Sequence, residues 1–460
     1  MITDSGVVPP PVAPITLTVV KQALHTIGVR SITMACRLAL VVMITRTLST
    51  ADYGAYSIVS TIGAFGALLC GLNLSTFVYR AVPGKPSIEQ LRIFKTAFLF
   101  EVSLTLIVAT LFLSSGQLTP LLRYLNATAY RNVFVLGLVL VVFLVANSEC
   151  TTFFQAQARL ERSNWVDFLG QAAWIVPLLA LRFGGLPVSL RMLLWAQLLG
   201  GVAVAIYAAA HIDLASWWRL KPDWSMLRTG LAFSVPLIVP TMGVNSVRLA
   251  DRLILSHYAS VAEVGIYSLA AVFINTLYSF TAGIISATFG PRIFAAHNRG
   301  DERQRDRLQT YMLKIAVVGF AVPYLILCVT AKQLFPLVAR PDYIRAAGVL
   351  PIVGLSSIIL IIGYPANYML TLQNRVVLLA TLDVVGMVIG IGANFLLIPR
   401  FSYYGAALSG VIALATTATF QYMYSHMLSR LNFRAIFSLR EEMALFRQCV
   451  ARLRQEFSPS

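Results

Sequence analysis

Four arginines lie inside apolar stretches that are long enough to cross a membrane. Arg30 and Arg37 fall in the first such stretch of the chain, and Arg248 and Arg252 fall in the seventh. A charged side chain at the centre of a bilayer costs at least about 2.5 to 3.5 kcal/mol, so each arginine is expected to face protein or a water-filled cavity. Because the planar guanidinium stays charged and binds phosphate through paired hydrogen bonds, these residues predict an anion-binding site.

The spacing of the arginines places them on common helix faces. Arg30 and Arg37 are two helical turns apart and therefore share one face. We expect these two helices to present their arginines toward one cationic cavity. A similar stripe on the later helix consists of Thr241, Asn245, Arg248 and Arg252.

Acidic residues in or near the apolar stretches allow a second interpretation. Asp251 can neutralise the arginines of the seventh stretch, and Glu101, Glu149 or Asp167 can neutralise those of the first. Asp251, Glu149 and Glu101 are therefore candidates either for charge balance or for a proton or Na⁺ site. Asp167 and Asp383 stand near the expected starts of their helices, where a carboxylate commonly caps the helix, and we expect that role for them.

The composition requires a membrane protein with many spans. Of the 460 residues, 58% are hydrophobic and 12% are charged, and the mean hydropathy is +0.75, whereas soluble domains carry about 25% charged residues. We expect an all-α fold in which two six-helix lobes are related by a pseudo-two-fold axis along the membrane normal. The twelve expected spans are 18–46, 53–79, 93–115, 132–155, 163–181, 188–211, 229–256, 263–289, 310–331, 346–372, 376–398 and 403–428.

The basic residues predict the orientation of the chain. Most of the 36 Lys and Arg residues fall in segments that share one side of the membrane with both termini, which places the termini in the cytoplasm. This bias and the anionic lipid of the inner leaflet explain much of the net charge of +17, so nucleic acid is not an expected partner. The expected organisation is a leader (1–17), an N-terminal lobe (18–212), a linker (213–228), a C-terminal lobe (229–430) and a basic amphipathic tail (431–460).

The chain repeats itself at a nearly constant interval. The nonapeptide STADYGAYS at 49–57 recurs as SVAEVGIYS at 260–268, and the same offset aligns Arg37 with Arg248. Farther along, QAR at 157–159 matches QNR at 373–375 with a slightly larger offset. These ordered matches predict that the two lobes are copies of one unit.

Several classes of function are not supported by the sequence. There is no G-x-x-x-x-G-K-[ST] phosphate loop and no cytoplasmic segment large enough for a nucleotide-binding domain, so we expect no nucleotide drive. The five cysteines lack metal-ligand or disulfide spacing, and we expect neither a metal nor another cofactor. No loop carries a catalytic arrangement of acids or histidines, so an enzyme is not expected.

Short motifs around the repeated segments resemble a known family. They are TRTL at 45–48 followed by DYGAY at 52–56, DRLIL at 251–255 followed by EVGIY at 263–267, and PRIF at 291–294 followed by GD at 300–301. The chain thereby resembles the polysaccharide-transporter branch of the multidrug/oligosaccharidyl-lipid/polysaccharide flippase superfamily. The likeness covers nearly the whole chain in the number and order of spans.

The resemblance implies a V-shaped bundle of twelve helices in the bacterial cytoplasmic membrane. Such a protein would flip polyprenyl-diphosphate-linked oligosaccharide units by alternating access, for exopolysaccharide, capsule or O-antigen assembly. Its implied partners are the lipid-linked substrate, the bilayer, a polysaccharide polymerase and a chain-length regulator. A gradient-coupled drug antiporter of the same superfamily and a membrane-embedded assembly enzyme are the alternatives; the intramembrane arginines argue against the antiporter, which usually takes cationic substrates.

Overall fold

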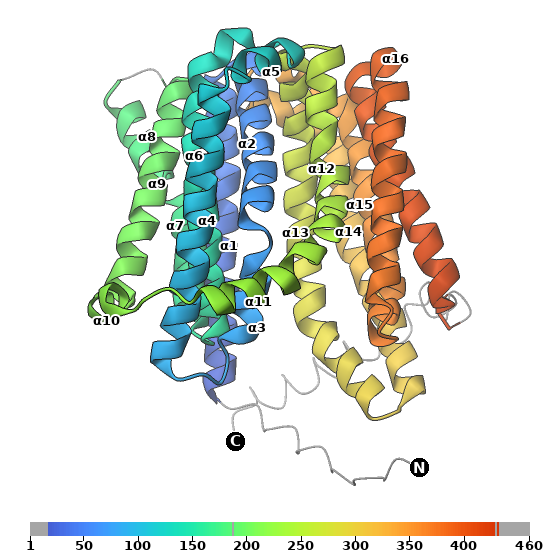
Figure 1. Ribbon diagram of the computed structural model, residues 1–460. Coiled ribbons are helices and arrows are strands. Elements are labelled where there is room, and N and C mark those ends of the chain that lie inside the picture. Colours follow the sequence, from blue (N-terminus) through green and yellow to red (C-terminus); the bar gives the residue numbers. More distant parts are fainter. Residues whose placement is uncertain (1–16, 186–187, 428–429, 432–460) are drawn as a thin grey trace, which may run out of the picture. The chain divides into compact units, whose positions relative to one another are not determined.

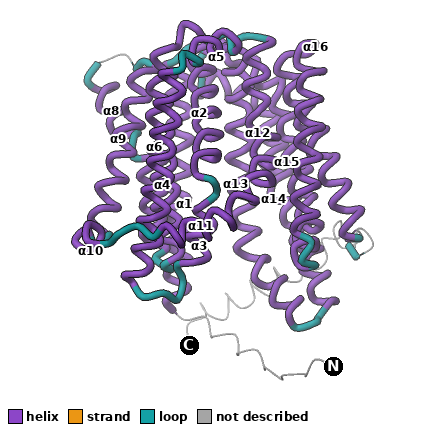
Figure 2. Tube along the Cα trace, viewed as in Figure 1, coloured by secondary structure: helices purple, strands orange, loops and turns teal. Residues whose placement is uncertain are grey.

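The computed structural model describes residues 17–185, 188–427 and 430–431, and every regular element in this part of the chain is a helix (Figures 1 and 2). The chain divides into two compact units, which we call unit 1 (Met1–Ile238) and unit 2 (Val239–Ser460). The expected leader (1–17) and basic tail (431–460) fall almost wholly outside the described residues. The expected all-α class is confirmed.

Unit 1 is organised around α6 (Arg131–Ala156). This helix packs against α2, α3, α4, α7 and α9. The other elements of unit 1 are α1 (Leu17–Thr47), α2 (Thr50–Gly71), α3 (Leu74–Ala81), α4 (Ser87–Ser114), α5 (Leu118–Tyr124), η1 (Thr128–Tyr130), α7 (Leu160–Ala172), α8 (Ile175–Phe183), α9 (Leu190–His211), α10 (Leu214–Arg219), α11 (Trp224–Ser234) and η2 (Val235–Leu237).

Unit 2 is built on longer helices, of which α15 packs against α13, α14 and α16. Its last helix is two segments joined at Ser402, where the backbone leaves the helical region (φ 51°, ψ −131°). This kink lies between the two spans expected at 376–398 and 403–428. The elements are α12 (Ile238–Tyr258), α13 (Val261–Asn298), α14 (Glu302–Val338), η3 (Pro341–Arg345), α15 (Ala346–Leu372) and α16 (Val376–Ser425).

Eight helices in the described residues are long and apolar enough to cross a membrane. The chain is thus a multi-pass membrane protein, whereas the count of twelve spans stays a prediction. The difference comes from α1, from the short pair α7 and α8, from the polar α12, and from the joined halves of α16, which count as one helix of 50 residues.

Two expected spans are interrupted. The span expected at 53–79 breaks after Gly71, because Leu72 (φ 46°) and Asn73 (φ 59°) both adopt left-handed backbone conformations before α3 begins. The span expected at 229–256 is also divided, since 229–234 belong to α11 and α12 starts at Ile238. A 3₁₀ turn that contains Pro236 separates the two, in agreement with the helix-breaking effect of proline.

The linker expected at 213–228 is mostly helical and packs against unit 1. It forms α10 and the first part of α11, and α10 packs against α4. The buried Lys95 of α4 donates hydrogen bonds from Nζ to the carbonyls of Trp217 (2.6 Å) and Leu220 (2.9 Å). These bonds satisfy carbonyls at the C-terminal end of α10, which no helical amide reaches.

Local geometry recurs at the repeated sequence positions. Ser49 caps α2 by accepting a hydrogen bond from the Asp52 amide, and Ser260 caps α13 by accepting one from the Glu263 amide. The two QxR matches form tight turns between helices, and the middle residue of each turn has φ 57°. Matching caps and turns at matching positions support a duplication.

Candidate functional site

Arg37 lies exposed on α1 beside a group of neutral polar side chains. Its charge acts on the hydroxyl of Tyr56 in α2, which also hydrogen-bonds to Ser60. Gln197 of α9 donates from Nε2 to the Tyr56 hydroxyl at 2.6 Å. An available guanidinium next to hydroxyl and amide donors is suited to an oxyanion.

Sequence reasoning missed Tyr56 and Gln197 as neighbours of Arg37. The signal for Tyr56 was present, because the tyrosine recurs as Tyr267 in the second nonapeptide. Nothing in the sequence marked Gln197, which comes from a helix far along the chain.

Arg252 of α12 is 6% exposed and lies in a network of polar side chains of unit 2. Its Nε donates to the Ser268 hydroxyl at 3.2 Å, and its guanidinium carbon is 6.0 Å from the centre of the Tyr267 ring. The Tyr267 hydroxyl donates to Asp251, whose carboxylate attracts the Arg252 charge. Of the two interpretations drawn from the sequence, these contacts favour charge balance by Asp251 for Arg252.

Arg30 and Arg248 lie in α1 and α12, but their side chains are outside the described part of the structure. Two other members of the α12 stripe are described. Asn245 donates from Nδ2 to the carbonyl of Thr241 at 2.8 Å, so this amide is engaged within its own helix.

Glu101 and Glu149 are brought together in unit 1 rather than beside the arginines of α1. Glu101 lies in α4 and Glu149 in the adjacent α6; they are 2% and 1% exposed, and their carboxyl groups hydrogen-bond to each other. Neither forms an ion pair with a cation in the described ranges. The expectation that they balance Arg30 or Arg37 is therefore not supported by any contact in this part of the structure.

Asp167 and Asp383 do not cap helices, and that expectation was wrong. Asp167 lies in the second half of α7 and accepts a hydrogen bond from Gln171 one turn later. Asp383 lies two turns into α16 and accepts one from Nε2 of Gln421 at 3.1 Å. α7 begins at Leu160, three residues before the expected start, and α16 begins at Val376 as expected. Asp167 and Asp383 each lie seven residues after the first residue of their helix, which is too far along for a cap.

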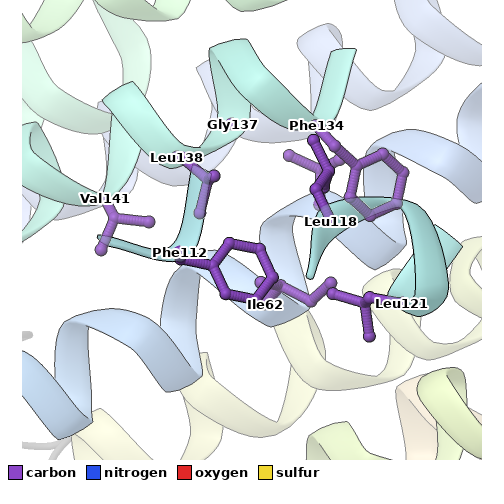
Figure 3. Close-up of a pocket in the computed structure, with 10 residues that line it drawn as sticks. Ile62, Phe112, Leu118, Leu121, Phe134, Gly137, Leu138 and Val141 are labelled. Atoms are coloured by element: carbon purple, nitrogen blue, oxygen red, sulfur yellow. The ribbon is translucent and has the colours of Figure 1, made fainter. Parts of the chain in front are cut away.

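Two apolar cavities lie in unit 1. The smaller has a volume of about 10 Å³ and lies between α2, α4, α5 and α6, where Phe112, Phe134 and Val141 line it (Figure 3). It has room for at most about one water molecule and is a packing defect. The larger, of about 310 Å³, lies between α4, α6, α9 and α10, and its only polar lining residues are Asn147 and Cys150.

Comparison with solved structures identifies the fold. The chain is similar to an inward-facing multidrug resistance MATE family transporter of the MOP superfamily, with a TM-score of 0.64 at 15% identity over 86% of this chain and 97% of that one. It is similar to the lipid II flippase MurJ in an inward closed conformation, with a TM-score of 0.70 at 12% identity over 95% and 94%. A third similar structure is a MOP superfamily transporter from Pyrococcus furiosus, with a TM-score of 0.58 at 14% identity over 88% and 93%.

These neighbours are transporters, and the likeness shows that the fold of this chain is MATE- and MurJ-like. No curated protein matches the sequence. A family model described as "Polysaccharide biosynthesis protein" matches residues 43–344, which is more than half of the chain. The resemblance seen in the short motifs is thus confirmed. The chain belongs to the polysaccharide biosynthesis protein family and has the fold of MOP superfamily transporters.

Proposed function

We propose that this protein is a flippase for polyprenyl-diphosphate-linked oligosaccharide units in polysaccharide assembly. One observation carries the proposal. The chain belongs to a polysaccharide biosynthesis family, and its fold is that of solved transporters, which include the lipid II flippase MurJ. A transporter in such a pathway has a chemical task, which is to carry polar sugars and a charged diphosphate across hydrocarbon. The products would feed exopolysaccharide, capsule or O-antigen assembly, with a polymerase and a chain-length regulator as partners.

The proposed arrangement has twelve spans in the bacterial cytoplasmic membrane and both termini in the cytoplasm. In this arrangement α7 and α8 together form one broken span, and the two segments of α16 form two spans. The predominance of basic residues in the segments assigned to the cytoplasm supports the orientation.

Arg37 is the residue that we propose to contact the diphosphate. It is exposed on α1, its neighbours Tyr56 and Gln197 are neutral, and no acid is paired with it in the described residues. Arg248, its equivalent in the sequence repeat, and Arg30 are proposed to contribute further positive charge. Arg252 has a different proposed role, since it is buried against Asp251 and would hold α12 and α13 together.

The decisive experiment compares Arg37→Ala with Arg37→Lys in purified protein reconstituted into vesicles with a defined lipid-linked oligosaccharide. Loss of the charge should lower the flipping rate by at least about tenfold, because one charged hydrogen bond is worth about 1.5 to 3 kcal/mol. Lys should restore part of the rate, since it keeps the charge but not the paired hydrogen bonds. Arg123→Ala, at an exposed arginine of α5, is the matched control and should leave the rate unchanged.

A strain without the gene separates a flippase from the alternatives. Complete lipid-linked units should accumulate in the inner leaflet, whereas loss of an assembly enzyme would leave incomplete units or unpolymerised units in the outer leaflet. Export of small cations without any movement of lipid-linked sugar by the reconstituted protein would instead favour the drug antiporter. Unchanged flipping by Arg37→Ala would contradict the role of this residue.

A further inference from the structure

Glu101 and Glu149, which contact each other inside unit 1, lie far from both ends of α4. Glu101 is half-way along α4, so that each end of this helix is about 20 Å away. Glu149 comes from α6, which packs directly against α4. The pair is therefore deep within the unit and shielded from water.

Among the described residues, no cation interacts with the carboxyl group of Glu101 or Glu149. Cys150 follows Glu149 and is buried, and Cys70 of α2 is also buried and hydrogen-bonds to Thr105. The hydroxyl of Thr105 donates to the main-chain carbonyl of Glu101 at 2.7 Å and not to its carboxyl group. Of these two thiols, that of Cys150 interacts electrostatically with Glu149.

Five charged or titratable groups on the helices around the pair have partners of their own. Lys95 of α4 is bonded to carbonyls of the α10 segment, and the guanidinium of Arg80 in α3 lies 4.9 Å from the centre of the Phe233 ring. In α7, Arg162 donates to the carbonyl of His211 at 3.4 Å and Asp167 pairs with Gln171. Nδ1 of His211 in α9 pairs with the carbonyl of Tyr207 at 2.8 Å.

One oxygen of the pair is left without a partner. Oε2 of Glu149 is buried and receives no hydrogen bond within the described residues, although the two carboxyl groups hydrogen-bond to each other. A buried acceptor without a donor is costly, by about 1 to 3 kcal/mol or more when it is charged. A proton or a small cation bound at this oxygen would remove the cost.

We propose that Glu101 and Glu149 form a proton-binding site that drives the conformational change of this protein. Two carboxylates in contact do not both ionise, so the resting pair holds one proton between its oxygens and one negative charge. A second proton taken from one aqueous side binds at Oε2 of Glu149 and makes the pair neutral. Release of this proton to the other side returns the pair to its singly charged form.

A proton fits this site better than a metal cation. Hard cations require about six oxygen ligands, and the pair offers few oxygens because Thr105 is committed to the main chain. Among the described residues, no group of three His, Cys, Asp or Glu side chains is placed to hold a metal ion. Proton exchange needs only the unpartnered carboxyl oxygen that the structure provides.

The pair lies next to the end of α2, the helix that carries Tyr56 beside Arg37. A Cβ atom on Gly71, the last residue of α2, would lie 3.7 Å from Oε1 of Glu101. The left-handed residues Leu72 and Asn73 follow directly and separate α2 from α3. A change of charge at Glu101 therefore acts next to the break between α2 and α3, where the backbone can change its direction. That such a change is coupled to flipping rests on the proposed function.

The test of proton binding uses the purified full chain without substrate. Infrared difference spectra recorded across a pH titration should show a carbonyl band of a buried protonated carboxylic acid that appears as the pH falls. Replacing both carboxyl groups, Glu101→Gln together with Glu149→Gln, should remove this titration, and Glu161→Gln, which changes an exposed acid of α7, should retain it. A hydrophobic carbodiimide should modify Glu101 or Glu149 in the unaltered chain, as located by mass spectrometry.

Reconstituted variants then separate this proposal from the proposed function. Glu149→Gln should flip substrate at a rate that no longer responds to an imposed pH gradient, whereas Arg37→Ala should flip slowly and keep the infrared titration. A chain with no protonated-carboxyl band and no carbodiimide product at either glutamate would overturn the proton site, even if flipping is observed. A band that responds to Na⁺ and not to pH would overturn it as well. Because the carbodiimide test uses the unaltered chain, poor folding of a variant does not prevent a decision.

Discussion

At the scale of single residues, the surroundings of a cation decide what it can bind. Arg37 is exposed and has a phenol and an amide nearby, so an incoming anion meets no competitor. Arg252 is buried beside Asp251, so its charge is already balanced and its Nε is bonded to Ser268. Removal of the two arginines should therefore affect different properties of the protein.

Arg252→Ala is expected to lower stability sharply, because Asp251 would remain as a buried charge without its partner. Breaking a buried ion pair in this way costs about 3 to 5 kcal/mol. The thermal midpoint of the detergent-purified protein measures the effect. Arg340→Ala is the control, since Arg340 is exposed and only 3.9 Å from an exposed Asp342; such surface pairs contribute about 0 to 1 kcal/mol. Equal midpoints for the two variants would show that Arg252 is not held as described.

The candidate site could be predicted from sequence only where a charge occurs in an apolar stretch. Arg37, Glu101 and Glu149 stood out because charges are rare in membrane helices. Their partners did not, because contact between Glu101 and Glu149 depends on how α4 and α6 rotate against each other. The pairing of Tyr56 with Gln197 likewise depends on packing that no local pattern encodes.

At the scale of elements, the breaks between and within helices were harder to predict than the helices themselves. The sequence predicted the order of the helices and the kink near 402, since charges, Pro and Gly punctuate the apolar stretches. It did not predict the break at Leu72 and Asn73, because neither residue is Gly or Pro, although both adopt a left-handed backbone. After the kink at Ser402, the chain packs tightly: a Cβ on Gly405 would overlap the carbonyl of Leu397.

Gly405→Ala should therefore destabilise unit 2, since the overlapping atom belongs to the main chain and cannot rotate away. Overpacking of this kind costs about 1 to 3 kcal/mol. Gly410→Ala is a matched control in the same helix, because a Cβ there meets nothing within 4 Å. The control should leave the thermal midpoint unchanged or raise it, as alanine favours helix over glycine. A higher midpoint for Gly405→Ala would contradict the close approach.

At the scale of the whole molecule, the two units have the same helix caps and turns at equivalent positions. Ser49 and Ser260 cap equivalent helices, and Ala158 and Asn374 occupy equivalent left-handed turns. The repeat in the sequence predicted this equivalence, because caps and turns depend on few neighbouring residues. The interiors have diverged more: positions 40 and 41, which align with Asp251 and Arg252, are Leu and Val in unit 1.

Ala158→Asn, which copies the second turn into the first, should stabilise the protein. Ala158 pays the steric cost of a left-handed backbone, about 1 kcal/mol, whereas Asn tolerates that conformation better. The reciprocal change, Asn374→Ala, should lower the thermal midpoint by a similar amount. If both variants shift the midpoint in the same direction, the two turns do not have the same energetics.

The hydrogen bonds of Lys95 attach the end of α10 to α4. Lys95 ties the Trp217–Leu220 segment to α4, and Glu101 lies six residues, or about 9 Å, farther along the same helix. The segment that follows α9 and one member of the carboxyl pair are therefore attached to the same helix.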